Sequence, residues 1–277
     1  NDSFSDDFKF NMSFNFTTIH NEVLFVSSDS GFEQGGSYGV GLGIFTSRME
    51  AGFPMGYFHG FKTNGLYQTQ AEIDDLNASA PDGTYHLGAG PGDLKFVDTN
   101  KDGIINDDDK TNIGDPIADL TMGFNVGFSY KNLDFSANAF ASVGNDMVRD
   151  YERNDIFANR GTYMLDRWQG TGTSNTVPRA VAGASINTDN FTDFAVEDAS
   201  FVRLQNIQVG YTIQEDGLKG SGISKLRIYL TGNNLFTITD YTGYDPSASN
   251  GSPIGAGVDK GFYPVASSYL IGVNLNF

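Results

Sequence analysis

Apolar and polar side chains alternate one by one along several stretches of this 277-residue chain. Residues 8–16 show the pattern most clearly: Phe or Met stands at every even position, and Lys, Asn or Ser stands at every odd position. Because successive side chains of an extended strand point to opposite sides, this stretch has one apolar face and one polar face. A helix would distribute the same residues around its circumference. The pattern therefore predicts β-strands that are apolar on one face only.

The same alternation recurs on both sides of a predicted tight turn. Residues 121–143 are predicted to form a hairpin of two strands joined by Lys131 and Asn132. The positions between the apolar residues are small or polar, except that Phe140 falls on the polar face. Further stretches with the strand pattern are residues 207–213, 226–230 and 269–277. We therefore expect an all-β chain of roughly six to nine strands.

Composition excludes several classes of protein. The chain has no cysteine, so a disulfide scaffold, a thiolate metal site and a cysteine nucleophile are all excluded. Its 34 acidic and 17 basic residues give a net charge of −17, which repels phosphate backbones, so nucleic acid is not an expected partner. No stretch approaches the roughly 18 consecutive apolar residues of a membrane-spanning helix, and residues 1–7 do not resemble a signal peptide. A membrane β-barrel needs only about ten alternating residues per strand and remains compatible with the sequence.

Long polar connections separate the predicted strands. These connections are rich in Asp, Asn, Gly, Ser and Thr, and they span residues 64–119, 144–198 and 236–266. Each is longer than about 15 residues, a length that loops without secondary structure rarely exceed in compact domains. Long loops on one side and short turns on the other are typical of outer-membrane barrels. Residues 150–157 and 163–168 are predicted to form short helices in the second connection. A soluble β-sandwich, in which two apolar faces pack together, is the alternative fold.

An acidic motif in the first long connection predicts a metal site. Residues 98–109 follow the D-x-N-x-D-G pattern of calcium-binding loops, in which oxygens at the first, third and fifth positions converge on one cation. Gly103 permits the sharp turn that this convergence requires. The twelfth position is Asp109 rather than the longer Glu of an EF-hand, and no amphipathic helix precedes the loop. The expected calcium ligands are Asp98, Asn100, Asp102, the backbone carbonyl of Ile104, Asn106 and Asp109.

No catalytic arrangement is recognisable elsewhere in the sequence. The histidines, His20, His59 and His86, lie in different segments without the spacing of a metal or catalytic motif, and no phosphate-binding glycine loop occurs. We therefore expect neither an enzyme nor an organic cofactor. Aromatic side chains of the long connections are candidates for stacking on sugars or contacting peptides. They are Tyr151, Tyr163, Trp168, Tyr241, Tyr244 and Tyr263.

Several motifs occur in an order that points to one family. Residues 91–105 have the form P-G-D-ϕ-x-ϕ-x-D-x-N-x-D-G-x-I, where ϕ is apolar, and residues 198–212 have the form A-S-[YF]-x-R-L-x-N-ϕ-x-ϕ-G-Y after their first residue. Residues 226–246 contain G-N-N-L-F followed by Y-T-G-Y-D-P, and the last strand ends in Phe277. Together these segments resemble the C-terminal part of the barrel in the SusC/RagA family of TonB-dependent outer-membrane transporters. The resemblance covers most of residues 50–277.

This resemblance implies a fold. The chain would supply the C-terminal strands of a large antiparallel transmembrane β-barrel, of the roughly 22-stranded, plugged type, with long extracellular loops. Residues 1–277 would be the C-terminal portion of such a receptor, without its plug and N-terminal domains. Residues 91–119 would form an extracellular loop that contains the calcium loop. The remainder of the same barrel would pair with the edge strands, and outer-membrane lipid would cover the apolar face.

The same resemblance implies a function and partners. The chain would be part of a TonB-dependent importer in the cell outer membrane that takes up glycan or peptide fragments. A SusD-like surface lipoprotein would act as its lid, and TonB would be contacted through the missing N-terminal region. Two alternatives remain. One is a soluble, calcium-stabilised β-rich module for binding or adhesion at the cell surface, and the other is a TonB-dependent importer of metal chelates.

Overall fold

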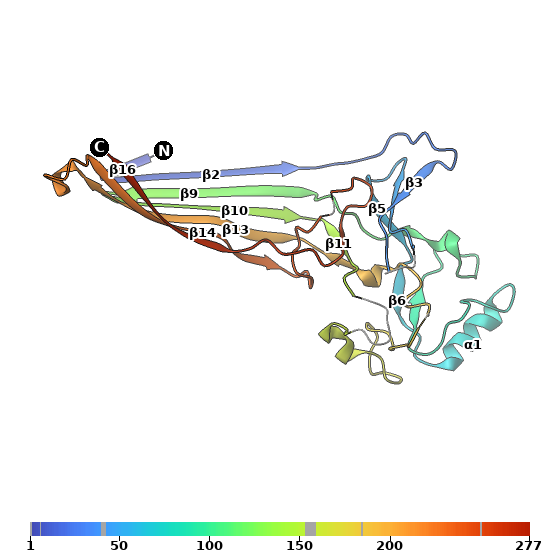
Figure 1. The fold of residues 1–277 in the computed structure, drawn as a ribbon. Coiled ribbons are helices and arrows are strands. Elements are labelled where there is room, and N and C mark those ends of the chain that lie inside the picture. Colours follow the sequence, from blue (N-terminus) through green and yellow to red (C-terminus); the bar gives the residue numbers. More distant parts are fainter. Residues whose placement is uncertain (1, 6, 40–42, 153–158, 184, 250) are drawn as a thin grey trace.

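A computed structural model describes residues 2–5, 7–39, 43–152, 159–183, 185–249 and 251–277. Its largest unit is a seven-stranded sheet in which every neighbouring pair of strands is antiparallel. In spatial order the strands are β1 (Asp2–Ser5), β2 (Phe8–Thr18), β9 (Leu120–Tyr130), β10 (Leu133–Val143), β13 (Phe201–Gln214), β14 (Lys225–Thr239) and β16 (Ser268–Asn276). They follow one another in the same order along the chain (Figure 1). The predicted strands and the predicted hairpin are therefore confirmed.

The two faces of this sheet differ as the alternation predicts. One face carries apolar side chains that stand largely exposed; Phe14, for example, is 57% exposed and Ile271 is 75% exposed. The other face carries small and polar side chains that form hydrogen bonds between strands. Phe140 lies on this polar face, opposite Gly123, and its ring lies 5.9 Å from that of Phe201. Because the apolar face is exposed rather than buried, the sheet is not half of a packed sandwich.

Short and long connections lie at opposite ends of the sheet, as predicted. The turn between β9 and β10 is formed by Lys131 and Asn132, and Lys131 has a φ of 53°, in the left-handed region. The connection between β13 and β14 spans residues 215–224 at the same end. The three long connections, residues 19–119, 144–200 and 240–267, all lie at the other end (Figure 1).

A bulge interrupts the pairing of β13 with both of its neighbours. The single residue between Leu204 and Asn206 stands opposite two residues of β14, and the register with β10 shifts at the same place. Asn234, one of those two residues, has a φ of 49°. Strict alternation from Asn206 would place Arg203 on the apolar face. Because of the bulge, Arg203 instead lies opposite Phe140, on the polar face.

The long connections are more structured than their composition indicates. They form a four-stranded sheet, a three-stranded sheet and a two-stranded pair. The four-stranded sheet contains β3 (Phe32–Gly35), β4 (Ser47–Glu50), β5 (Tyr57–Gly60) and β8 (Thr111–Asn112). The three-stranded sheet contains β12 (Val196–Asp198), β11 (Asp146–Arg149) and β15 (Val258–Asp259). The pair consists of β6 (Thr63–Leu66) and β7 (Leu94–Phe96). In the three-stranded sheet, β11 pairs with β15 in parallel, so two different connections share one sheet.

In the described part of the chain, the helices lie in the long connections, except for one short turn between β13 and β14. The longest, α1 (Gln70–Ser79), was not predicted; it begins after Thr69, whose hydroxyl accepts a hydrogen bond from the Glu72 amide at 3.2 Å. The other helices are the short 3₁₀ turns η1 (Asp107–Asp109), η2 (Thr162–Asp166), η3 (Asp193–Ala195) and η4 (Glu215–Gly217). No described helix has the length and apolar character that crossing a membrane requires.

The two predicted short helices have different outcomes. The one expected at residues 163–168 corresponds to η2, which is a 3₁₀ turn that begins one residue earlier and ends two residues earlier. Of the one expected at residues 150–157, residues 150–152 are not helical, so that part of the prediction is wrong, and residues 153–157 lie outside the described residues. The sequence there lacks the apolar 3.6-residue repeat that would let a helix pack against the other long connections.

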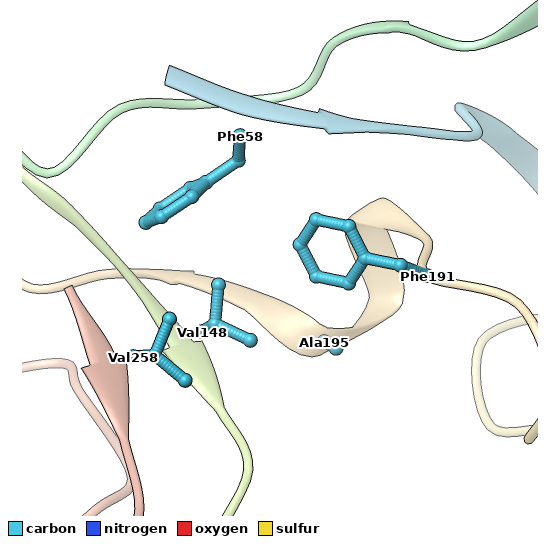
Figure 2. Packing of buried hydrophobic residues seen from close by; sticks show 5 residues of the cluster. All are labelled: Phe58, Val148, Phe191, Ala195 and Val258. Carbon is cyan, nitrogen blue, oxygen red and sulfur yellow. The ribbon is translucent and has the colours of Figure 1, made fainter. Parts of the chain in front are cut away.

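The apolar core lies between the long connections rather than on the main sheet. One cluster consists of Phe58, Val148, Phe191, Ala195 and Val258, which are all at most 3% exposed (Figure 2). The three long connections each contribute to it. A second cluster joins Phe61 to residues of β6 and β7. The three long connections therefore fold as one packed unit, called the loop body below, and burial of these side chains holds them together.

Candidate functional site

A row of amide and hydroxyl side chains crosses the polar face of the main sheet at one level. Its members are Ser13, Asn125, Asn138, Asn206, Asn233 and Ser268. Asn138 and Asn206 are paired in register at the centre, and from each of them a chain of hydrogen bonds of 2.7–3.2 Å runs outward over two further strands. This row gives the sheet a polar wall that water or a polar molecule can contact.

An ion pair on the same face spans three strands. Arg227 of β14 donates from Nε to Oδ1 of Asp134 on β10 at 3.0 Å, and from Nη2 to Oδ2 at 2.5 Å. Its Nη2 also donates to Gln208 of β13, the strand between them, at 2.8 Å. Gly210 leaves the space for this contact, because a Cβ at that position would lie 2.5 Å from Nη2. The polar wall is thus held together across the strands at a second level, by an ion pair as well as by the amide row.

Two of the sequence motifs meet in a buried ion pair beyond the bulge. Arg203 donates from Nη2 to Oδ1 of Asp245 at 2.6 Å, and the two side chains are only 10% and 5% exposed. Asp245 also accepts hydrogen bonds from Ser247 and from the backbone amide of Val265. Burial raises the pKa of Asp245, but the hydrogen bonds and the ion pair outweigh it and lower the pKa to about 2. The pair therefore ties the loop after β14 to strand β13.

The P-G-D motif forms a second junction between connections. Asp93 is buried and accepts two hydrogen bonds from the guanidinium of Arg179, at 2.7 and 2.9 Å. Asn187 donates to the same carboxylate at 2.8 Å. Gly92 lies against Trp168, where a Cβ would come within 2.4 Å of the indole ring. This motif therefore joins Arg179 and Asn187 of the second connection to the first connection, a role that the sequence does not reveal.

The predicted calcium loop forms a tight turn. Asp98 accepts hydrogen bonds from the backbone amides of Lys101 and Gly103, at 2.6 and 2.9 Å. Asn100 and Asp102 accept from the amides two residues further on, at 2.9 Å in both cases. The first three predicted ligand side chains thus share one turn, and Gly103 has a φ of 86°.

The remaining predicted ligands lie at the end of this loop. Asn106 caps the turn η1 by accepting from the Asp108 amide at 2.7 Å, and Ile104 connects the two halves of the loop. Asp109 is fully buried, and its two carboxylate oxygens accept from the amides of Thr99 and Asn106. Among the described residues, no group of three or more His, Cys, Asp or Glu side chains is placed to hold a metal ion. Calcium binding, which also relies on Asn and carbonyl oxygens here, stays a prediction.

Two of the three histidines, His86 and His59, lie in structural surroundings, whereas His20 is exposed beside Glu22. His86 is buried, packs 4.6 Å from the ring of Phe96, and shares a 3.2 Å hydrogen bond with the hydroxyl of Tyr67. Burial lowers the pKa of His86 to about 4. The pKa of His59 is likewise lowered to about 4 by burial and by the charges of Arg48 and Lys110. Both imidazoles are therefore neutral at pH 7.

Two adjoining cavities open between the long connections. The larger has a volume of about 390 Å³ and the smaller about 260 Å³, and Arg149, Glu152 and Tyr163 line both. Of the candidate loop aromatics, Tyr151 and Tyr244 line the smaller cavity. Trp168 and Tyr241 instead pack in apolar clusters, and Tyr263 is fully exposed. The structure thus brings three of the six aromatic candidates together.

Sequence reasoning missed the residues that join the connections to one another. Arg203, Asp245 and Asp93 belong to recognised motifs, but their partners lie between 42 and 86 positions away. Helix α1 had a detectable signal, because Thr69 and Glu72 have the spacing of an N-terminal capping box. Tyr151, Tyr163 and Tyr244 were candidates from the sequence, but no comparable local signal identifies Arg149 and Glu152, the charged residues that line the same cavities.

Curated proteins similar in sequence are TonB-dependent receptors. Receptor P3 of Formosa agariphila is 32% identical over 283 residues, which cover 99% of this chain and 27% of that receptor. SusC of Bacteroides thetaiotaomicron is 32% identical over 276 residues, which cover 98% of this chain and 25% of SusC. The chain therefore spans about a quarter of the length of these relatives. No protein-family model matches it.

Solved structures of similar fold belong to RagAB. The RagAB peptide transporter matches with a TM-score of 0.73 and 22% identity, over 99% of this chain and 28% of the matched chain. RagAB described as a peptide importer in the open-open state matches with a TM-score of 0.71 and 24% identity, over 99% of this chain and 27% of the matched chain. The fold is therefore that of the strands and loops of such a barrel. Together with the sequence relatives, this fold shows that the chain belongs to the SusC/RagA family of TonB-dependent receptors.

Proposed function

We propose that this chain forms part of the wall and the extracellular loops of an outer-membrane importer. The observation that carries the proposal is the main sheet, which has an exposed apolar face, a hydrogen-bonded polar face, and all of its long connections at one end. An apolar face of this kind is stable against lipid, and the polar face suits a lumen. The similarity to TonB-dependent receptors supports the same assignment.

The energy and the partners would come from outside this chain. An importer of this family would be driven by TonB through a region beyond residues 1–277, and the remainder of the barrel would pair with the edges of β1, β2 and β16. The cargo would be glycan or peptide fragments; RagAB, of similar fold, is described as a peptide importer. A SusD-like lipoprotein would cover the loop body from outside. The chain itself would have no enzymatic role and no organic cofactor.

Calcium would have a structural role in this proposal. Asp98, Asn100 and Asp102 share one turn, and shared coordination of a cation would replace the repulsion between the two carboxylates. The loop that carries them, residues 91–119, contributes β8 to the four-stranded sheet. A bound ion would therefore stiffen the extracellular body.

Deletion of the gene for the full receptor tests the importer. We expect the full receptor in the outer-membrane fraction, extractable only with detergent. Uptake of radiolabelled oligosaccharide or peptide mixtures should fall to background both in the deletion strain and in a strain without TonB. A SusD-like lipoprotein should copurify with the receptor. A full-length product that stays soluble without detergent, or uptake that does not need TonB, would contradict the proposal.

A further inference from the structure

The smaller cavity has the features of a sugar site. We propose that this cavity, between Tyr151, Tyr163 and Tyr244, binds one ring of a neutral saccharide. The inference rests on the proposed importer function and specifies the class of its cargo. Four properties of the described residues support it: the aromatic surface, its rigid support, the balance of charge, and the volume.

The aromatic surface is formed by two tyrosines from different connections. The rings of Tyr151 and Tyr244 lie 5.9 Å apart with their planes tilted by 45°, and Tyr244 is 69% exposed. Both rings line the cavity together with that of Tyr163, so three aromatic side chains surround it. The C–H face of a sugar ring packs against such an aromatic surface, while its hydroxyl groups need polar neighbours.

Tyr244 sits on a turn that is rigid although its side chain is exposed. The next residue, Asp245, is buried and held by Arg203. The preceding residue is Gly243, where a Cβ would lie 2.3 Å from the ring of Tyr241, so the turn packs closely against that ring. Because the turn is already fixed, a ligand that binds to Tyr244 does not have to order the backbone that carries it.

The polar groups around the cavity favour a neutral ligand. The cavity is lined by one cation, Arg149, and one anion, Glu152. Arg149 donates to Glu197 at 2.8 Å, and Glu152 accepts from the Tyr163 hydroxyl at 2.5 Å, so both charges already have partners. A charged ligand would have to compete with these pairs, whereas sugar hydroxyls can use the remaining lone pairs of Glu152.

The volume limits the size of the bound group. At about 260 Å³, the cavity is slightly smaller than the about 300–1,000 Å³ of sites for drug-sized ligands. One saccharide ring is therefore the unit that fits. The larger cavity shares a wall with it at Arg149, Glu152 and Tyr163, so a longer chain has room to continue.

Binding to the full receptor in detergent tests the inference without energised transport. The probes are neutral hexasaccharides of glucose, mannose, galactose and xylose, and affinity is measured by titration calorimetry. We expect at least one probe to bind and the Tyr244→Ala variant to bind it about tenfold more weakly. Tyr244→Phe, which keeps the ring, should stay within about twofold of the wild type. Tyr263→Ala, at an exposed tyrosine outside the cavity, should bind like the wild type.

Two results would overturn the sugar site. One is that none of the four hexasaccharides binds the wild-type receptor. The other is that Tyr244→Ala binds as tightly as the wild type while retaining the wild-type thermal unfolding profile. Neither result touches the importer itself, because TonB-dependent uptake of cargo is measured separately in cells. Uptake that does not depend on TonB would instead contradict the proposed function.

Discussion

The ring of Tyr229 on β14 lies directly over Gly272 on β16. The two residues are paired in register, and a Cβ at position 272 would lie 2.2 Å from Cζ of the tyrosine. The glycine therefore leaves room for an aromatic ring on the polar face, next to the edge strand of the described sheet. Several residues of the chain are placed by contacts of this kind between strands, and they can be tested one at a time.

Substitution of Gly272 should loosen the edge strand. In Gly272→Ala the new methyl group would displace the ring of Tyr229, and we expect the full receptor to lose about 1–3 kcal/mol of stability, as for other overpacked sites. The change in temperature of unfolding, followed by heat-modifiable mobility on gels, measures it. Asn274→Ala, two residues further along the same face, serves as the control. Equal stability of the two variants would show that the ring moves aside without cost.

A charge on the apolar face should block assembly, whereas the same charge on the polar face should be tolerated. Ile271 is 75% exposed on the apolar face, near the middle of β16. Ile271→Lys should cost about 2–4 kcal/mol in lipid and reduce the amount of folded receptor in vesicles. Leu270→Lys, at the neighbouring position on the opposite face of the same strand, beside Thr231, should fold like the wild type. If both variants fold equally well, the apolar face does not contact lipid.

Loss of Arg203 should release the loop that follows β14. Arg203→Met leaves the carboxylate of Asp245 buried without its cation, and removal of one partner of a buried pair costs about 3–5 kcal/mol. We expect residues 240–266 to become sensitive to limited proteolysis of the full receptor, with cleavage sites identified by mass spectrometry. Lys219→Met, at an exposed lysine near the opposite end of the sheet, provides the comparison. Unchanged protection in the Arg203 variant would rule out the anchoring role.

The stability of the receptor should depend on the protonation of Asp245 at low pH. The folded-state pKa of this carboxyl is about 2, below its ordinary value of 3.8. A lowered pKa means that the stabilisation is complete above about pH 4 and is lost as the pH falls towards 2. In thermal unfolding between pH 5 and 2, the wild type should lose stability more steeply than Asp245→Asn. Asp216→Asn, at an exposed carboxylate, should keep the wild-type slope; equal slopes for all three proteins would contradict the assignment.

Calcium should protect the turn at residues 98–104 from proteolysis. Lys101 is exposed within this turn, so trypsin can cleave after it when the loop opens. At a calcium concentration ten times the dissociation constant, cleavage of the full receptor should slow by roughly tenfold. The double variant Asp98→Asn, Asp102→Asn should lose this protection, and Asp107→Asn, outside the predicted ligand set, should retain it. An equal rate of cleavage of the wild type with and without calcium would contradict calcium binding by this loop.

The strands were predictable because their signal is local. Alternation in residues 8–16 and 121–143 follows from the two-residue repeat of an extended chain, and the pairing at Lys131 and Asn132 needs only a short turn. Even Phe140, an exception on the polar face, was placed correctly by its position in the repeat. The family was predictable for the same reason, since its motifs are short and contiguous in the sequence.

Tertiary structure decided the bulge at β13 and the body formed by the long connections. The bulge depends on how three strands fit together, and it alone turns Arg203 toward the polar face and Asp245. The core pairs Val148 with Val258 across 110 positions, and polar composition hides the few apolar residues that each connection contributes. A repeat along the chain determines which side of a strand is apolar, because neighbouring residues alone set that geometry. Which distant side chains meet depends on the packing of the whole chain, so only the tertiary structure brings Tyr151, Tyr163 and Tyr244 to one cavity.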